Sequence, residues 1–324
     1  MTTHRERIEA CFNGEPLDRT PIALWRHFPE EDQNPETLAA ATIKFQQAYD
    51  LDIVKVTPAS SFAVKDWGVE DEWKQNPEGS REYTKRIIRN PKDWETLQPL
   101  DPTAPHLAAQ LQCLRLIRES IGADTPMIQT IFNPLSQAKN LAGNDVLLEH
   151  IRTHPEAVME GLKTIAKTTI NFIEAAREAG IDGIFYAVQH AQASMLELDE
   201  YKSIGLMFDQ RVLASADDLW CNILHLHGKD VYFSLLRLFN FQIVNWHDRE
   251  TYPSLAEAQS LFRGVVCGGL RQETLVSGTR NQVKDEAKNA IEQTKSRRFI
   301  LGTGCVVPYV APHENILMAR RSVE

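Results

Sequence analysis

The stretch Ile223-Leu224-His225-Leu226-His227 is the segment of this sequence that says most about its fold. Successive side chains of a β-strand point to opposite faces, so the two histidines share one face and the two leucines share the other. We expect the leucines to face covering helices and the imidazoles to face the axis of a barrel. The stretch therefore predicts a buried strand that carries polar groups toward an active site.

Similar short apolar runs recur along the chain, each separated from the next by a turn and a stretch of helical period. Eight parallel strands separated by helices are the number that closes into a barrel, so we predict a (β/α)8 barrel. The alternative is an open doubly wound sheet, but no GxGxxG turn follows the first strand to support it. The predicted strands are 22–25, 53–57, 127–132, 183–187, 223–227, 242–246, 264–267 and 299–302.

We expect a single α/β domain spanning residues 1–324, because no repeat, low-complexity tract or flexible linker divides the chain. A helix over 5–12 precedes the barrel. The segment 58–105, rich in tryptophan, proline and charge, is long for a connection and is interpreted as an elaboration that covers one barrel mouth. Further helices are expected over 107–117, 134–141, 155–178, 212–220, 254–262 and 281–295.

The composition excludes several classes of partner. The 324 residues are 43% hydrophobic, and 35 Lys and Arg against 44 Asp and Glu give a formal charge of -9, so we expect neither nucleic acid nor an anionic membrane as a partner. No apolar run is long enough to span a bilayer, and the polar start lacks a hydrophobic signal core, which predicts a cytoplasmic protein. Five scattered cysteines argue against a disulfide framework.

Residues at the C-terminal ends of barrel strands are the candidates for chemistry. Two imidazoles at His225 and His227 suit a divalent metal, and Cys305, in Leu301-Gly302-Thr303-Gly304-Cys305 after the last strand, is placed to add a thiolate. The alternative is that the histidines form ordinary hydrogen bonds in a polar mouth and that Cys305 is a small packing residue.

Other strand-end residues complete the predicted site. His247 and Asp248 follow the sixth strand and suit proton transfer, orientation of a ligand or a further metal contact, although a salt-bridged loop is the alternative. His190 follows the fourth strand and joins His247 and Asp248 as a catalytic candidate. Arg26 follows the first strand and could clamp a carboxylate or phosphate, unless it is simply exposed. The predicted substrate-binding residues are Arg26, Gln189, Trp246 and Asn133.

Several short motifs, in this order, resemble the uroporphyrinogen decarboxylase superfamily over nearly the whole chain, and this resemblance also implies a (β/α)8 barrel. The motifs are Arg5-Glu6-Arg7-Ile8-Glu9-Ala10, Asn13-Gly14, Asp18-Arg19-Thr20-Pro21, Asp93-Trp94-Glu95 before Leu100-Asp101-Pro102, Phe132-Asn133-Pro134-Leu135, and Pro312-His313-Glu314-Asn315-Ile316.

That superfamily contains decarboxylases and zinc methyltransferases that move methyl groups between a corrinoid carrier and a thiol such as coenzyme M. The decarboxylases carry an arginine-rich RQAGR-type loop after strand one, where this chain reads Arg26-His27-Phe28-Pro29. They also use an aspartate after strand two, where this chain reads Val56-Thr57-Pro58. Both departures favour the methyltransferase branch, because a polycarboxylate substrate needs matched cations and an acid at its pyrroles.

The methyltransferase branch holds zinc with a His-x-Cys pair on strand five and a cysteine after strand eight. The resemblance thus implies a zinc site at His225, His227 and Cys305, a methyl-corrinoid donor or acceptor, and a corrinoid protein as partner. Imidazole at residue 227 replaces one thiolate, which makes the metal a stronger Lewis acid and admits other small-molecule acceptors. The alternatives are uroporphyrinogen decarboxylation with an altered arginine loop and a non-catalytic corrinoid- or tetrapyrrole-binding protein.

Overall fold

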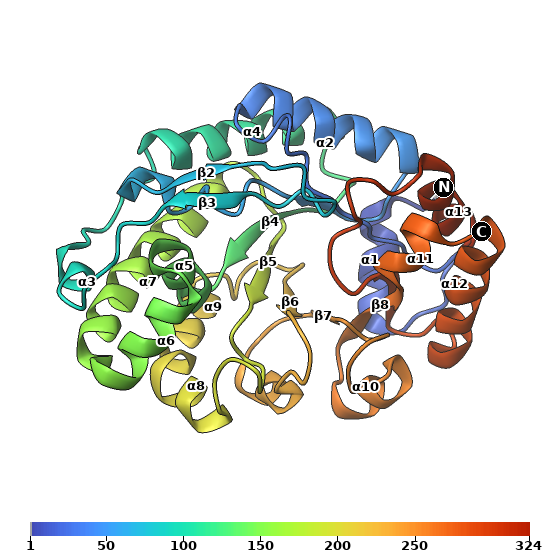
Figure 1. The fold of residues 1–324 in the computed structure, drawn as a ribbon. Helices are drawn as coiled ribbons and strands as arrows, with labels where there is room; N and C mark the ends of the chain where they lie inside the picture. Colours follow the sequence, from blue (N-terminus) through green and yellow to red (C-terminus); the bar gives the residue numbers. More distant parts are fainter. Residues whose placement is uncertain (1) are drawn as a thin grey trace.

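A parallel seven-stranded sheet forms the centre of the computed structural model, which describes residues 2–324 (Figure 1). Neighbouring strands are hydrogen-bonded in chain order, so the sheet curls as in a TIM barrel. The seven strands confirm seven of the eight predicted. They are β1 (Val54–Val56), β4 (Met127–Phe132), β5 (Gly183–Val188), β6 (Ile223–Leu226), β7 (Ile243–Trp246), β8 (Val265–Leu270) and β9 (Phe299–Thr303).

The predicted strand over 22–25 is reduced to a single parallel bridge between Ile22 and Leu301 of β9. On its other side, the Ile22 carbonyl accepts from the Asp52 N–H at 2.8 Å, so the segment lies between β9 and the chain that enters β1. The Ile22 N–H donates to the Asp52 carboxylate at 2.8 Å, and Pro21 has no N–H. Because a side chain takes the place of a ladder hydrogen bond, the eighth strand is not formed as predicted.

Helices flank the sheet along the chain (Figure 1). The predicted helix over 212–220 is wrong beyond residue 214, because the Ser215 hydroxyl donates to the Val212 carbonyl at 2.7 Å and ends the helix. The longer helices are α1 (His4–Asn13), α2 (Pro35–Tyr49), α4 (Pro105–Ile121), α5 (Pro134–Ala142), α6 (Asn144–Thr153), α7 (Pro155–Glu178), α9 (Leu206–Ala214), α12 (Arg280–Thr294) and α13 (His313–Arg321). The shorter ones are η1 (Lys65–Trp67), α3 (Asp93–Thr96), α8 (Leu198–Ile204), η2 (Phe233–Leu238), α10 (Leu255–Leu261) and α11 (Gln272–Ser277).

The elaborated segment after β1 contains an antiparallel hairpin, β2 (Glu70–Glu72) and β3 (Glu82–Lys85). The Arg81 guanidinium joins this hairpin to the rest of the protein, because it lies 3.1 Å from the Asp32 carboxylate and 3.3 Å from the Asp71 carboxylate. Residues 78, 80–83 and 86 line the same cavity as the ends of the barrel strands. The segment therefore covers the mouth at which those strands end, as predicted.

Within the described residues, no helix is both long and apolar enough to cross a membrane.

Candidate metal centre

Four side chains from three strand ends converge at this mouth. His225 lies on β6, His227 follows β6, His247 follows β7, and Cys305 follows β9. Each offers one ligand atom, and these four atoms all lie within 4.8 Å of one another. The three imidazole rings have centroids 5.1 to 6.0 Å apart.

The sheet register explains why these residues meet. His225 is paired with Asn245 across β6 and β7, so His227 and His247, each two residues further on, lie at equivalent places beyond the ends of adjacent strands. Gly304 brings Cys305 to them, because its backbone packs directly against the backbone of His247 and leaves no room for a side chain. The predicted trio of His225, His227 and Cys305 is thus brought together.

The donor set suits zinc. Buried polar atoms are normally hydrogen-bonded, yet His225 Nε2 and His247 Nε2 are buried without a partner among the described residues. His227 Nδ1 lies 3.8 Å from Cys305 Sγ. Imidazole nitrogen and thiolate sulfur are the ligands that zinc prefers in proteins. The two unpartnered nitrogens and the nearby thiol are what a metal site of three histidines and one cysteine would present.

Burial sets the protonation states of these groups. It lowers the pKa of His227 to about 4 and that of His225 well below its ordinary value, so both rings are neutral, as metal ligation requires. Burial also raises the pKa of the Cys305 thiol to about 11. A cation at this position would offset that penalty and favour the thiolate.

A cavity of about 610 Å³ opens beside the candidate site and is lined by His225, His227 and Cys305. Four lysine or arginine side chains also line it: Lys55 of β1, Arg81 before β3, Arg86 after β3 and Lys139 of α5. Arg81 is paired with the carboxylates of Asp32 and Asp71. Sequence reasoning missed all four. A signal was present for Lys55, since a lysine between two valines of a predicted strand points to one face, as His225 does. For Arg86 and Lys139 no sequence signal distinguished them from surface cations.

Of the predicted site residues that follow β5 and β7, some point toward the cavity and others point away from it. Gln189 lines the cavity and accepts a hydrogen bond from the Lys139 ammonium at 2.6 Å. His190, one residue on, is buried outside the lining, and burial lowers its pKa to about 3. The Asp248 carboxylate points toward β8, where it accepts from the Gly269 N–H at 3.1 Å. The structure therefore does not bring His190 or Asp248 into the cavity.

Three of the four predicted substrate-binding side chains also lie outside the cavity lining. The Trp246 indole is fully buried on the opposite face of β7 from Asn245 and donates to the Pro253 carbonyl at 2.9 Å. The Arg26 guanidinium lies 4.7 Å from the centroid of the Tyr309 ring. Asn133 is buried, caps α5, and donates to the Asp209 carboxylate at 3.0 Å. The contacts of each of these three side chains within the fold explain its position without a substrate.

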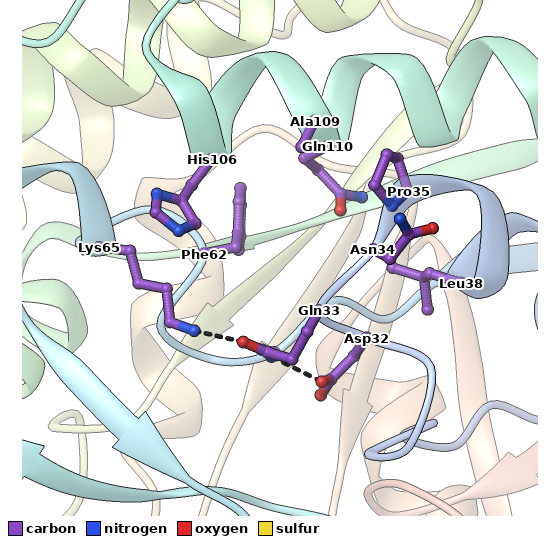
Figure 2. A pocket seen from close by; sticks show the side chains of 11 residues that line it. Asp32, Gln33, Asn34, Pro35, Leu38, Phe62, Lys65, His106, Ala109 and Gln110 are labelled. Atoms are coloured by element: carbon purple, nitrogen blue, oxygen red, sulfur yellow. Dashed lines mark hydrogen bonds between the residues drawn. The ribbon is translucent and has the colours of Figure 1, made fainter.

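A second hollow lies beside α2 and α4 and is shown in Figure 2. Its polar lining includes His106, Gln110 and Lys65, and the Lys65 ammonium donates to the Gln33 side chain. It offers only about 40 Å³ and shares no lining residue with the large cavity. Its size is that of a water site. A further hollow of about 480 Å³, lined by Arg263, Arg297 and Arg298 among others, includes none of the candidate ligands. The large cavity beside the metal centre is therefore the candidate for substrate.

The fold and the site together define a TIM-barrel-like α/β protein with a candidate His/Cys metal centre at the mouth of the strands. The family model described as uroporphyrinogen decarboxylase (URO-D) matches residues 3–324, and the chain belongs to this family.

The relatives by sequence are methyltransferases. The chain is 23% identical to the methylcobamide:CoM methyltransferase MtaA of Methanosarcina barkeri, over 97% of this chain and 95% of that protein. It is 19% identical to the methylcobamide:CoM methyltransferase MtbA of Methanosarcina acetivorans, with the same coverage.

Solved structures show the same fold. A methyltransferase from Methanosarcina mazei superposes with a TM-score of 0.82 at 19% identity, over 99% of this chain and 98% of that one. A B12-independent methionine synthase from Shewanella sp. W3-18-1 gives 0.57 at 14% identity, over 94% and 92%.

Proposed function

We propose that this protein is a zinc-dependent methyltransferase that moves a methyl group between a corrinoid, or another methylated substrate, and a thiol or similar acceptor. The observation that carries this proposal is the convergence of His225, His227, His247 and Cys305 within 4.8 Å beside a cavity of substrate size. The likeness to methylcobamide:CoM methyltransferases supports a methyl-corrinoid as the donor, presented by a corrinoid protein.

His225, His227 and Cys305 would hold the ion, and they line the cavity from which an acceptor would approach. His247 is a fourth candidate ligand and lies outside the cavity lining. When bound, zinc would supply a Lewis acid that lowers the pKa of an acceptor thiol. A shell with a single thiolate carries less negative charge than one with two, which widens the range of acceptors.

The cavity also indicates what kind of acceptor it takes. Arg86 Nε is buried without a hydrogen-bond partner, Lys139 donates to the Gln189 amide, and Lys55 donates to the Thr57 hydroxyl at 3.1 Å. No carboxylate of residues 2–324 lies within 4.0 Å of these three cations. Unpaired cations at partly buried positions are costly, so we propose that the acceptor carries a negatively charged group that they bind.

In the transfer itself, the acceptor thiol gives up its proton to solvent, and its sulfur forms a bond to the methyl carbon. The bond from that carbon to the donor breaks, and the electron pair of that bond leaves with the donor. The protein's part is to hold both partners in line and to exclude water. The aromatic rings of Trp25 and Phe185, which line the cavity near Lys55, would exclude water.

The test is incubation of zinc-loaded protein with methylcobalamin and a panel of thiols, with loss of methylcobalamin and formation of the methyl thioether as readouts. We expect transfer by the wild type, loss of transfer in Cys305→Ser, and wild-type transfer in Cys113→Ser, which alters a buried cysteine of α4. A zinc-loaded wild type that methylates no acceptor in the panel contradicts the proposal.

Uroporphyrinogen decarboxylation is the alternative within the family, and the cationic lining would suit a polycarboxylate. Against it, no aspartate is among the residues that line the described cavity, and Arg26 lies outside it. Release of carbon dioxide from uroporphyrinogen in the same preparation would favour this alternative.

A further inference from the structure

One buried amide, that of Asn245 on β7, links the strands that carry the candidate ligands. Its side-chain nitrogen donates to the Cys267 carbonyl at 3.0 Å and to the Thr303 carbonyl at 2.9 Å. Its side-chain oxygen lies 2.7 Å from His225 Nδ1. Asn245 is fully buried, so water cannot replace these partners.

These contacts fix the orientation of the amide. A carbonyl oxygen can only accept, so only the Asn245 nitrogen can face Cys267 and Thr303. Its oxygen must then face His225, and since that oxygen can only accept, His225 Nδ1 must carry the ring proton. The neutral ring has one proton, so Nε2 has a free lone pair, and Nε2 is the buried His225 nitrogen without a partner.

We propose that Asn245 is a positioning residue of the metal centre, which selects the His225 tautomer that leaves Nε2 free to bind the metal. The Phe185 ring stacks on His225, with centroids 5.1 Å apart, and limits rotation of the imidazole. This inference rests on the proposed zinc site, although the tautomer itself does not depend on any metal.

Asn245 also couples the ligands on β6 and β9. The Thr303 carbonyl that accepts from it lies two residues before Cys305, and the Thr303 hydroxyl donates to the Cys305 carbonyl. One amide thus holds both the imidazole of His225 and the turn that presents the thiol. Residues that orient ligands in this way typically change metal affinity about 10- to 100-fold when replaced.

The direct test is a long-range 1H–15N correlation spectrum of metal-free protein labelled at histidine, with the His225 signals assigned by their loss in His225→Gln. We expect the proton on Nδ1 in the wild type and a shift toward the Nε2-protonated tautomer in Asn245→Leu. Zinc affinity, measured by competition with a chromophoric chelator, should fall about 10- to 100-fold in Asn245→Leu.

Asn222 provides a matched control at the opposite end of β6. Its nitrogen also donates to two carbonyls, of Ala216 and Leu219, and its oxygen accepts from the Ile184 N–H. Asn222→Leu should lose stability without changing the His225 tautomer or the zinc affinity of the folded protein.

Two results would overturn the role of Asn245: a wild-type His225 protonated on Nε2, or unchanged zinc affinity in a folded Asn245→Leu protein. A wild type that binds no zinc but carries the proton on Nδ1 would instead contradict the proposed function and support the selection of the tautomer by Asn245.

Discussion

Gly304 packs so closely against His247 that a Cβ at residue 304 would lie 2.7 Å from the Cα of His247. This contact joins the turn after β9 to the end of β7, and it brings Cys305 beside the three imidazoles. A side chain at residue 304 would force the two backbones apart.

We therefore expect Gly304→Ala to weaken zinc binding and to cost about 1–3 kcal/mol of stability, as overpacking usually does. Denaturant unfolding and chelator competition measure the two effects. Gly278→Ala is the control, because its Cβ would lie 2.5 Å from the Thr274 carbonyl, away from the cavity. It should lose stability and keep the zinc affinity of the wild type, and equal losses of affinity in both variants would count against the role of Gly304.

Lys55 makes the stability of the protein depend on pH. Burial lowers its pKa from an ordinary value of 10.5 to about 7. Below pH 7 both folded and unfolded chains hold the proton, and the penalty of a buried charge is fully present. Between about pH 7 and 10.5 the folded chain loses the proton while the unfolded chain keeps it, so the Lys55 contribution to stability rises with pH.

Lys55→Met removes this titration. We expect the variant to be more stable than the wild type near pH 6 and the difference to shrink as the pH approaches about 9 to 10. Urea unfolding of both proteins across this range measures it. A difference that is independent of pH would show that Lys55 does not titrate as its burial predicts.

Arg86 and Lys139 are brought together because the N–H groups of Ile87 and Ile88 donate to the Leu141 carbonyl at the end of α5. Burial, together with the charge of Arg86, lowers the pKa of Lys139 to about 8. We expect Arg86→Gln and Lys139→Gln each to raise KM for an anionic acceptor about 10- to 100-fold, the usual worth of a hydrogen bond to a charged group.

Lys85→Gln is the matched control for this pair, since Lys85 precedes Arg86 but forms an exposed ion pair with Glu70. Exposed ion pairs contribute little to stability, and the KM for the anionic acceptor should not change in Lys85→Gln. Unchanged KM in Arg86→Gln and Lys139→Gln would mean that the acceptor binds elsewhere in the cavity.

The sequence predicted most of the barrel because the period of its apolar runs is a local property. Seven of the eight predicted strands are formed in the structure. The segment at Ile22 differs because its N–H binds the Asp52 carboxylate, a contact between residues thirty positions apart. Contacts of that kind leave no periodic signal.

The convergence of His225, His227 and Cys305 was also predictable. All three residues lie at or just after the end of a predicted strand, and the alternation of side chains along a strand places both histidines on the same face. The same alternation explains why Gln189 lines the cavity while His190 does not, and why the Asp248 carboxylate points away from the imidazole of His247 toward β8. Arg86 and Lys139 reach the cavity only through the elaborated segment and α5. Their placement depends on tertiary packing that the sequence pattern does not encode.

The proposed metal centre is tested most directly by the zinc content of the protein after purification without chelator and equilibration with zinc. We expect about one zinc per chain in the wild type and in Cys113→Ser, and strongly reduced zinc in His225→Ala and Cys305→Ser that remain folded by circular dichroism. A wild type that holds no zinc, or a Cys305→Ser protein that binds zinc as tightly as the wild type, would contradict it.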